Sequence, residues 1–274
     1  MKETKITFRT MKFDFYDKGF PRYWHSDSAS ITFFFNALSS AFPPGEKFFC
    51  DSVVYFKNHL QDEELKKQID LFVKQEMHHA FYHKKFNKML ESMGFDMKKA
   101  EQRNADFLNF ARKNYNPMEQ LALTLAFEHF TAALAFELLE KDDFKNRAHK
   151  SVGELWLWHA AEELEHKSIA MEVFLKMNGR YRTRLRVYLV AFYYLFSIAF
   201  KNQFDMLKCD GRLTLKEYMI TFWYLFGPRG LLVGVLKSLF TFLRPGFNPQ
   251  DHDTSYLHKK WEEENQSQIV GRAS

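Results

Sequence analysis

The chain has 274 residues, of which 46% are hydrophobic and 18% are aromatic, so it can bury a large core and is not intrinsically disordered. Its net charge of +5 is mild and is not gathered in a dense block of lysine and arginine, which argues against nucleic-acid binding. With 11 glycines and 7 prolines, the composition favours long helices over a turn-rich β architecture.

The first segment, residues 1–26, is predicted to be an extended N-terminal arm. Its hydrophobic residues alternate with polar ones, which is the period of a β-strand. We expect the arm to serve as a lid or as a packing strap. The alternating residues are Ile6, Phe8, Met11, Phe13 and Phe15.

Residues 27–180 contain the start and stop signals of a bundle of long helices. Asn116, Pro117 and Glu119 form a strong start signal, because asparagine caps a helix, proline fits its first position and glutamate its third. Pro43-Pro44-Gly45 is expected to break the chain between two helices. The predicted helices run from Asp27 or Ser28 to about 42, from about 46 to 60, and over 62–93, 97–114, 117–141 and 146–178.

Residues 181–243 are strongly apolar and are predicted to form helices that pack on this bundle. The uncharged stretch 187–200 is too short to span a membrane, and Gly227-Pro228, Arg229 and Lys237 interrupt the apolar stretch 218–243. Two interpretations remain open: buried helices that extend the bundle, or an amphipathic or re-entrant element at a membrane surface. The last segment, 244–274, is polar and is expected to wrap the surface.

Two features bear on the cellular compartment. Cys50 and Cys209 make no disulfide framework, which is typical of a reducing compartment. The N-terminal sequence has no apolar segment of the kind found in signal peptides. We expect a cytoplasmic protein, with peripheral contact with the inner membrane surface as the alternative suggested by residues 187–243.

Two of the predicted helices carry glutamate and histidine on the face that should be buried. Residues spaced alternately four and three apart lie on one face of a helix. On the helix 62–93 these are Leu65, Ile69, Phe72, Glu76, His79, His83, Phe86 and Leu90. The helix 146–178 repeats the pattern with Val152, Trp156, His159, Glu163, His166, Ala170, Val173 and Met177.

Two further carboxylates lie on predicted inward faces. Glu128 is the one ionisable side chain in the stripe of the helix 117–141, and Glu46 begins the inward face of the helix 46–60. Burying unpaired carboxylates costs far more than hydrogen bonds return, so four of them need cations. Two divalent metal ions supply this charge. The alternative, a core of hydrogen-bonded histidine and glutamate, leaves too much negative charge unpaired.

The spacing of these residues indicates how the metals are held. A lone glutamate from each of two helices, with Glu-x-x-His from each of two others, is the ligand pattern of ferritin-like di-iron and di-manganese four-helix bundles. At i and i+3 the two side chains project one turn apart, so the histidine can bind one metal while the glutamate bridges both. Oxygen-rich ligation suits iron or manganese better than zinc. The candidate ligands are Glu46, Glu76, His79, Glu128, Glu163 and His166.

Other polar residues near these stripes are weaker candidates. His159 lies one turn before Glu163 and is either a third histidine ligand or a hydrogen-bond donor to a ligand. His83 and Glu162 are expected to be hydrogen-bond partners of ligands. Asp251-His252-Asp253 has metal-like composition, but it lies in the polar tail and is not expected to bind a metal.

Several stretches of the chain are similar to a known family. They are PPGEKFF (43–49), QEMHHAFYH (75–83), AFEHF (126–130), WHAAEELEHKSIAMEV (158–173) and RPGFNPQDHD (244–253). Through them the chain resembles a family of bacterial proteins described as predicted metal-dependent hydrolases. The ligand order also resembles that of ferritin-like di-iron proteins, and His159 resembles the seventh ligand of di-iron arylamine N-oxygenases. One departure is that Glu46 follows Pro-Pro-Gly at a helix start and does not lie mid-helix.

Three functions compete on this evidence. The first is an O₂-dependent di-iron oxidoreductase, which needs an electron donor and holds a hydrophobic small molecule in its aromatic core. The second is a two-metal hydrolase that cleaves an ester or phosphoester. The third is a non-catalytic metal-storage or structural site, which the basic net charge disfavours. We expect a monomer or dimer rather than a storage cage.

Overall fold

The long helices begin at the start signals in the sequence. The structure is a computed structural model that describes residues 6–13, 15 and 19–273. The Asn116 capping box starts α5 (Pro117–Glu140), as predicted, and α3 (Glu63–Ser92) begins one residue after its predicted start, with Asp62 as its cap. α1 (Ala29–Ser39) and α4 (Met97–Asn114) also follow predicted helices. The described secondary structure is helical apart from one two-stranded sheet, which confirms the all-α bundle.

The second helix differs from its prediction at its start. α2 spans Phe42–Lys57, so Pro43 and Pro44 lie in its first turn and do not separate it from α1. Proline is tolerated there because the first-turn N–H groups have no intrahelical partner. The expected break at Pro43-Pro44-Gly45 is therefore wrong, and the first helix ends at Ser39. Glu46 consequently lies one turn inside α2.

The predicted helix 146–178 is two shorter helices, α7 (Lys150–His166) and α8 (Ile169–Lys176), and the short helix α6 (Asp142–Arg147) precedes them. The chain is extended before α7 because the His149 N–H donates to the Trp24 carbonyl at 2.7 Å. α7 ends after His166, where the Lys167 ammonium donates to the His252 carbonyl at 2.6 Å. The prediction of one continuous helix is wrong, because contacts with distant segments interrupt it.

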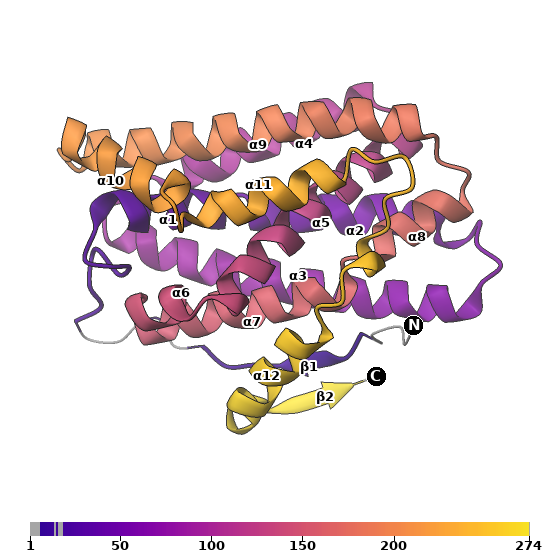
Figure 1. Cartoon of the computed structure of the whole chain (residues 1–274), viewed down its shortest axis with the longest axis horizontal. Helices are drawn as coiled ribbons and strands as arrows, with labels where there is room; N and C mark the ends of the chain where they lie inside the picture. Colours follow the sequence, from indigo (N-terminus) through magenta and orange to yellow (C-terminus); the bar gives the residue numbers. More distant parts are fainter. Residues whose placement is uncertain (1–5, 14, 16–18, 274) are drawn as a thin grey trace.

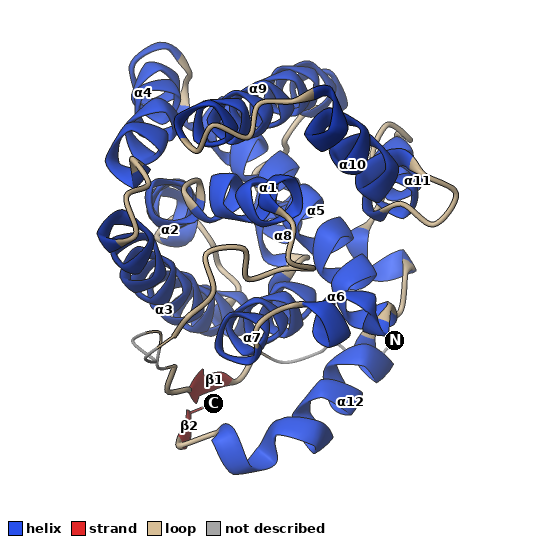
Figure 2. Cartoon of the chain, turned by 90° about the vertical axis from the view of Figure 1, so that its left-hand side faces the viewer, coloured by secondary structure: helices blue, strands red, loops and turns tan. Residues whose placement is uncertain are grey.

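The helices are arranged around α5, which lies at the centre of the bundle (Figures 1 and 2). α3 packs on α2, and α7 packs on α5, so these four helices surround one interior. α4 packs on α2, and α12 (Ser255–Asn265) packs on α7. Three further helices cover α5 and α1. These are α9 (Tyr181–Cys209), α10 (Leu215–Phe226) and α11 (Leu231–Thr241).

The two ends of the chain meet beside α7 and α12. β1 (Phe8–Thr10) pairs antiparallel with β2 (Gly271–Ala273), with Arg9 opposite Arg272. Ile6 and Met11 are buried, so the described part of the arm packs closely. The remainder of the predicted arm, at 1–5, 14 and 16–18, lies outside the described residues. The C-terminal segment wraps the surface but also forms α12 and a 3₁₀ turn at Pro249–Asp251, which were not predicted.

Among the described helices, α5 and α9 are long and apolar enough to cross a membrane by length and composition. The pair α10 and α11 passes the same test together, with a bend of 48° between them. The exclusion of residues 187–200 as too short therefore does not hold, because the helix extends over 29 residues. In α5 the apolar window is 78% buried within the protein, whereas in α9 it is 28% buried.

Candidate metal centre

Four helices bring the seven candidate ligands into one buried interior. α2 supplies Glu46, α3 supplies Glu76 and His79, and α5 supplies Glu128. α7 supplies the other three from consecutive turns. None of the seven is more than 3% exposed. The last three are His159, Glu163 and His166.

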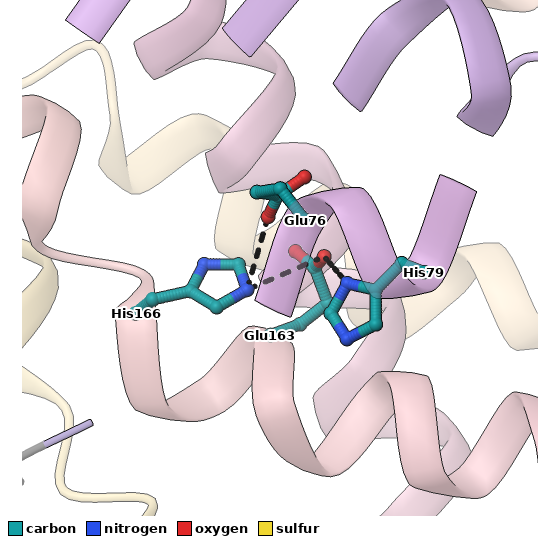
Figure 3. Close-up of side chains that lie close together, drawn as sticks. All are labelled: Glu76, His79, Glu163 and His166. Carbon is teal, nitrogen blue, oxygen red and sulfur yellow. Dashed lines mark ion pairs between the residues drawn. The ribbon is translucent and has the colours of Figure 1, made fainter. Parts of the chain in front are cut away.

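Glu163 lies at the centre of this cluster. Its Oε1 lies 2.9 Å from His159 Nε2, 3.7 Å from His166 Nε2 and 3.8 Å from His79 Nδ1. Figure 3 shows the His166 ring pointing towards Glu76 and Glu163, with His79 on the other side of Glu163. Three ring nitrogens from two helices thus face one carboxylate oxygen, which is the arrangement expected around a bridging ligand.

The ligand atoms form two overlapping groups, each compact enough to surround an ion. In one group the ligand atoms of Glu76, His79, Glu163 and His166 all lie within 4.8 Å of one another. In the other, those of Glu46, His79 and His159 do so. Glu128 joins the first group through His166, whose Nδ1 lies 3.0 Å from Glu128 Oε2.

Several ligand atoms in the cluster make no hydrogen bond within the protein, although His166 Nε2 lies 3.1 Å from Glu76 Oε1. Both carboxylate oxygens of Glu46 and of Glu76, and Oε1 of Glu128, are buried without a hydrogen bond. The same holds for Nδ1 of His79 and Nε2 of His166. Buried polar atoms are almost always hydrogen-bonded, and a buried charge without a partner is very costly. The residues present therefore fit divalent cations.

A chain of hydrogen bonds indicates which ring nitrogen of a neutral His159 carries the hydrogen. The Asn87 amide donates to Glu101 at 2.7 Å, so its Oδ1 accepts from the Ser39 hydroxyl at 2.7 Å. The Ser39 oxygen can then accept from Nδ1–H of His83 at 2.9 Å. Burial lowers the pKa of His83 well below its ordinary value, so its Nε2 has no hydrogen and accepts from Nδ1–H of His159 at 2.9 Å. A neutral His159 is left with a bare Nε2.

The other two histidines are held in the same way. His79 Nε2 lies 2.9 Å from Glu162 Oε2, and a neutral His79 that donates to an ionised Glu162 has a bare Nδ1. His166 donates from Nδ1 to Glu128 at 3.0 Å, and its Nε2, 3.1 Å from Glu76 Oε1, becomes bare when the ring gives up its second proton. Each of these nitrogens faces a carboxylate oxygen, and two lone pairs face each other favourably only with a proton or a metal ion between them. Carboxylates that orient metal-binding histidines are common in metal sites.

Burial and mutual repulsion change the pKa values of the metal-free cluster. Burial raises the pKa of Glu46 and of Glu76 well above the ordinary value, and repulsion from Glu128 and Glu163 raises both further. Burial also raises the pKa of Glu128 to about 7. Burial opposes ionisation of Glu163, but His166 beside it brings its pKa below the usual value. Metal ions therefore compete with protons for these carboxylates.

The residues predicted to support the ligands lie where expected, and others were missed. His83 contacts His159, and Glu162 contacts His79, so both touch candidate ligands. Asn87 extends the same helical stripe one turn past His83, a spacing that could have identified it. Ser39 and Thr131, whose hydroxyl donates to Glu163, carry no such signal. Asp251, His252 and Asp253 are exposed and lie outside the cluster.

Comparison with known families identifies the chain. A family model described as "predicted metal-dependent hydrolase" matches residues 7–253. The chain belongs to this family. Comparison with curated proteins and with solved structures gave no match. In this member of the metal-dependent hydrolase family, the matched region includes all seven candidate ligands and ends before α12.

A small apolar cavity in this family member reaches the cluster from the side of α9. It encloses about 60 Å³ and is lined by Glu46, Phe49, Phe127, Phe130 and Tyr194, among others. A second cavity of about 20 Å³ lies against His159 and Glu163. The first has room for roughly two water molecules. A larger molecule can therefore reach Glu46 only when the surrounding side chains move.

Proposed function

We propose that the protein is a two-metal enzyme with a ferritin-like centre, in which seven side chains hold the ions. They are Glu46, Glu76, His79, Glu128, His159, Glu163 and His166. The observation that carries the proposal is the set of buried carboxylate oxygens and bare ring nitrogens that face one another without partners. The ligand set, rich in carboxylate, suits iron or manganese better than zinc.

The first reaction to test is hydrolysis, which the family's description supports. Two bound divalent ions would supply Lewis acidity and lower the pKa of water. The chain itself contributes the surroundings of the reaction. The aromatic lining of the 60 Å³ cavity would bind the apolar part of an ester beside Glu46 and exclude bulk water. The Thr131 hydroxyl, which donates to Glu163, would keep that carboxylate oriented.

A second candidate is O₂-dependent oxidation of a hydrophobic small molecule. It is favoured by the nearly all-apolar lining of the cavity and by the carboxylate-rich ligand set, in which a third histidine, His159, faces Glu46 at 3.5 Å. In this case the surrounding rings would hold the substrate and keep water away from the reacting centre. An external electron donor is then required.

One pair of assays separates the two reactions. Protein loaded with Mn²⁺ or Zn²⁺ is given p-nitrophenyl esters of increasing chain length without O₂, and protein loaded with Fe²⁺ is exposed to O₂ in an oxygen-electrode cell. Hydrolysis predicts anaerobic ester turnover that is lost in Glu163→Ala. Oxidation predicts O₂ consumption and a change in the visible spectrum of the iron protein. If the loaded protein does neither, it is not an enzyme of either class, and size-exclusion chromatography tests for a storage cage.

A further inference from the structure

The outward face of α10 is apolar, which is the reverse of an ordinary surface helix. The spacing of its residues at three and four places them on one continuous stripe. Only Glu217 and Leu225 of this helix are buried. We call the stripe the α10 face. It comprises Leu215 (78% exposed), Tyr218 (47%), Met219 (48%), Phe222 (52%), Trp223 (58%) and Phe226 (39%).

The exposed apolar surface continues from α10 onto α11. Val233 and Phe240 of α11 are also exposed, and the two helices meet at the turn 227–230. Both views of the molecule show α10 on the side opposite β1, β2 and the outer end of α12 (Figures 1 and 2). Soluble proteins rarely leave a large contiguous apolar area in water, so this face calls for a partner.

Basic residues precede and follow the α10 face along the chain. Between Lys208 and Arg244 the chain has six basic residues and two acidic ones. Both acidic residues are already engaged: Asp210 pairs with Arg22, and Glu217 accepts a hydrogen bond from the Ser30 N–H. Among the described residues, no ion pair involves the exposed basic residues Lys208, Lys216, Arg229 and Lys237.

We propose that the α10 face docks the protein on an anionic lipid bilayer, with α10 lying in the interface plane. A helix of 12 residues is about 18 Å long, too short for a hydrocarbon core of about 30 Å, and the 48° bend prevents α10 and α11 from acting as one straight span. Tyr218 and Trp223 are the residue types that anchor proteins at lipid headgroups. Apolar anchors flanked by lysine and arginine are typical of interfacial helices.

Charge also decides between a bilayer and a second copy of the chain. In a two-fold dimer through this face, Lys216 and Arg229 of one copy would approach the same residues of the other, and the nearby carboxylates of Asp143 and Asp210 are already paired with Arg147 and Arg22. Anionic headgroups neutralise this charge. The proposal does not depend on which reaction the metal centre catalyses.

Tryptophan fluorescence tests the proposal on the full chain. Of the five tryptophans, all of them in the described part of the chain, four are buried and Trp223 is exposed. Adding vesicles of phosphatidylglycerol and phosphatidylcholine should therefore shift the emission to the blue, and brominated lipids should quench it. Vesicles of phosphatidylcholine alone, or high salt, should weaken binding at least tenfold. An unchanged spectrum with anionic vesicles would overturn the proposal.

Matched variants locate the surface. Met219→Glu/Phe222→Glu keeps Trp223 and should reduce flotation with anionic vesicles at least tenfold. Phe81→Glu is the control, because Phe81 on α3 is 51% exposed and Phe222 is 52% exposed. Thermal unfolding of both variants checks the fold. Equal loss of flotation in Phe81→Glu would contradict the assignment. The proposal would also be contradicted if the wild type bound no vesicles but formed a dimer that Met219→Glu/Phe222→Glu dissociates.

A second pair of variants tests the charge. Lys216→Gln/Arg229→Gln should weaken binding to anionic vesicles and make it less sensitive to salt. Lys84→Gln/Lys88→Gln on α3 removes the same charge from exposed positions elsewhere and should leave binding unchanged. Equal weakening by both pairs would mean that net charge alone drives binding, and it would overturn a docking role for α10.

Discussion

Glu76 is fully buried, and neither of its carboxylate oxygens has a hydrogen-bond partner. Glu76→Gln removes one negative charge at nearly constant volume. We expect the metal content to fall from about two ions per chain to one or fewer. The free energy of unfolding of the metal-free variant should be about 1 kcal/mol higher than that of the metal-free wild type, because a neutral amide is less costly to bury than a carboxyl group whose pKa is raised by burial. Elemental analysis and denaturant unfolding measure the two effects.

The matched control lies on the same helix. Glu63→Gln changes a side chain that is 75% exposed and paired only with Lys66, so metal content and stability should stay the same. A Glu76→Gln protein that still binds its full metal complement would contradict the assignment of Glu76 as a ligand.

The hydrogen-bond chain behind His159 predicts an effect without loss of a ligand. Ser39→Ala removes the acceptor for His83 Nδ1–H, so the tautomer of His83 is no longer fixed. The neighbouring His159 then loses the hydrogen bond that places its hydrogen on Nδ1 and keeps Nε2 bare. We expect metal affinity to fall about 10- to 100-fold. Competition with a chelator measures the affinity, and the absorption bands of bound Co²⁺ report the geometry.

Ser52→Ala is the corresponding control, because Ser52 is also buried but its hydroxyl forms hydrogen bonds with the Phe49 carbonyl and the Thr124 hydroxyl. The prediction fails if both alanine variants weaken metal binding by the same factor.

The pKa values of the metal-free centre predict how its stability depends on pH. Burial opposes protonation of His166, but Glu163 and Glu128 raise its pKa to about 9, compared with 6.5 in the unfolded chain. The folded protein therefore binds this proton more tightly, and stability falls as pH rises from 6.5 to about 9. Burial lowers the pKa of His79 and His83, so both are neutral in this range and do not oppose the trend.

We expect the melting temperature of the metal-free protein to fall between pH 6.5 and 9, and that of the metal-loaded protein to change less, because metal replaces the protons. Differential scanning calorimetry in matched buffers measures both. A metal-free melting temperature that rises across this window would contradict the charge distribution described for the cluster.

At the scale of single helices, signals close to a helix start predicted where that helix begins, whereas contacts with distant segments could not be predicted from the sequence. The capping box at Asn116 and the start of the helix near Asp62 could be predicted, because each signal lies within a few residues of the helix that it starts. The end of α7 could not, because Lys167 is held by His252, which is distant in sequence. The stripes of Glu76 and Glu163 were predictable because they depend only on helical spacing, whereas Ser39, the hydrogen-bond partner of His83, lies on another helix.

The cap of the central helix gives a prediction for stability. Asn116 accepts from the Glu119 N–H at 3.0 Å, and Glu119 accepts from the Asn116 N–H at 3.0 Å. Asn116→Ala should lower the free energy of unfolding by about 1 kcal/mol. Metal content should not change, because Glu128 lies three turns further along α5. Asn109→Ala on α4 is an exposed control, and an equal loss there would show that the cap is not the cause.

The whole molecule is tied together where the N-terminal arm and the C-terminal segment meet α7. Arg9 of β1 is 2% exposed and makes two hydrogen bonds to Glu165, at 2.8 and 2.9 Å. His258 of α12 lies 3.0 Å from the same carboxylate, and Arg9 lies 3.8 Å from Glu162, the partner of His79. No sequence pattern joins these residues, because they come from three distant segments.

Arg9→Met should destabilise the protein by about 3–5 kcal/mol, because it leaves Glu165 buried without its cation. Arg9→Met/Glu165→Gln should recover part of this loss, since the unpaired charge is removed as well. Denaturant unfolding of the wild type, of Arg9→Met, of Glu165→Gln and of the double variant completes a double-mutant cycle. Additive losses in the double variant would show that the pair is not coupled.

The central claim is that two metal ions occupy the interior between α2, α3, α5 and α7. The most direct measurement is elemental analysis of the protein purified from metal-replete cells, paired with the same analysis of Glu163→Ala. We expect about two equivalents of iron, manganese or zinc per chain in the wild type and a large loss in the variant. Wild-type protein that contains no metal and takes up none from Fe²⁺, Mn²⁺ or Zn²⁺ would contradict the account.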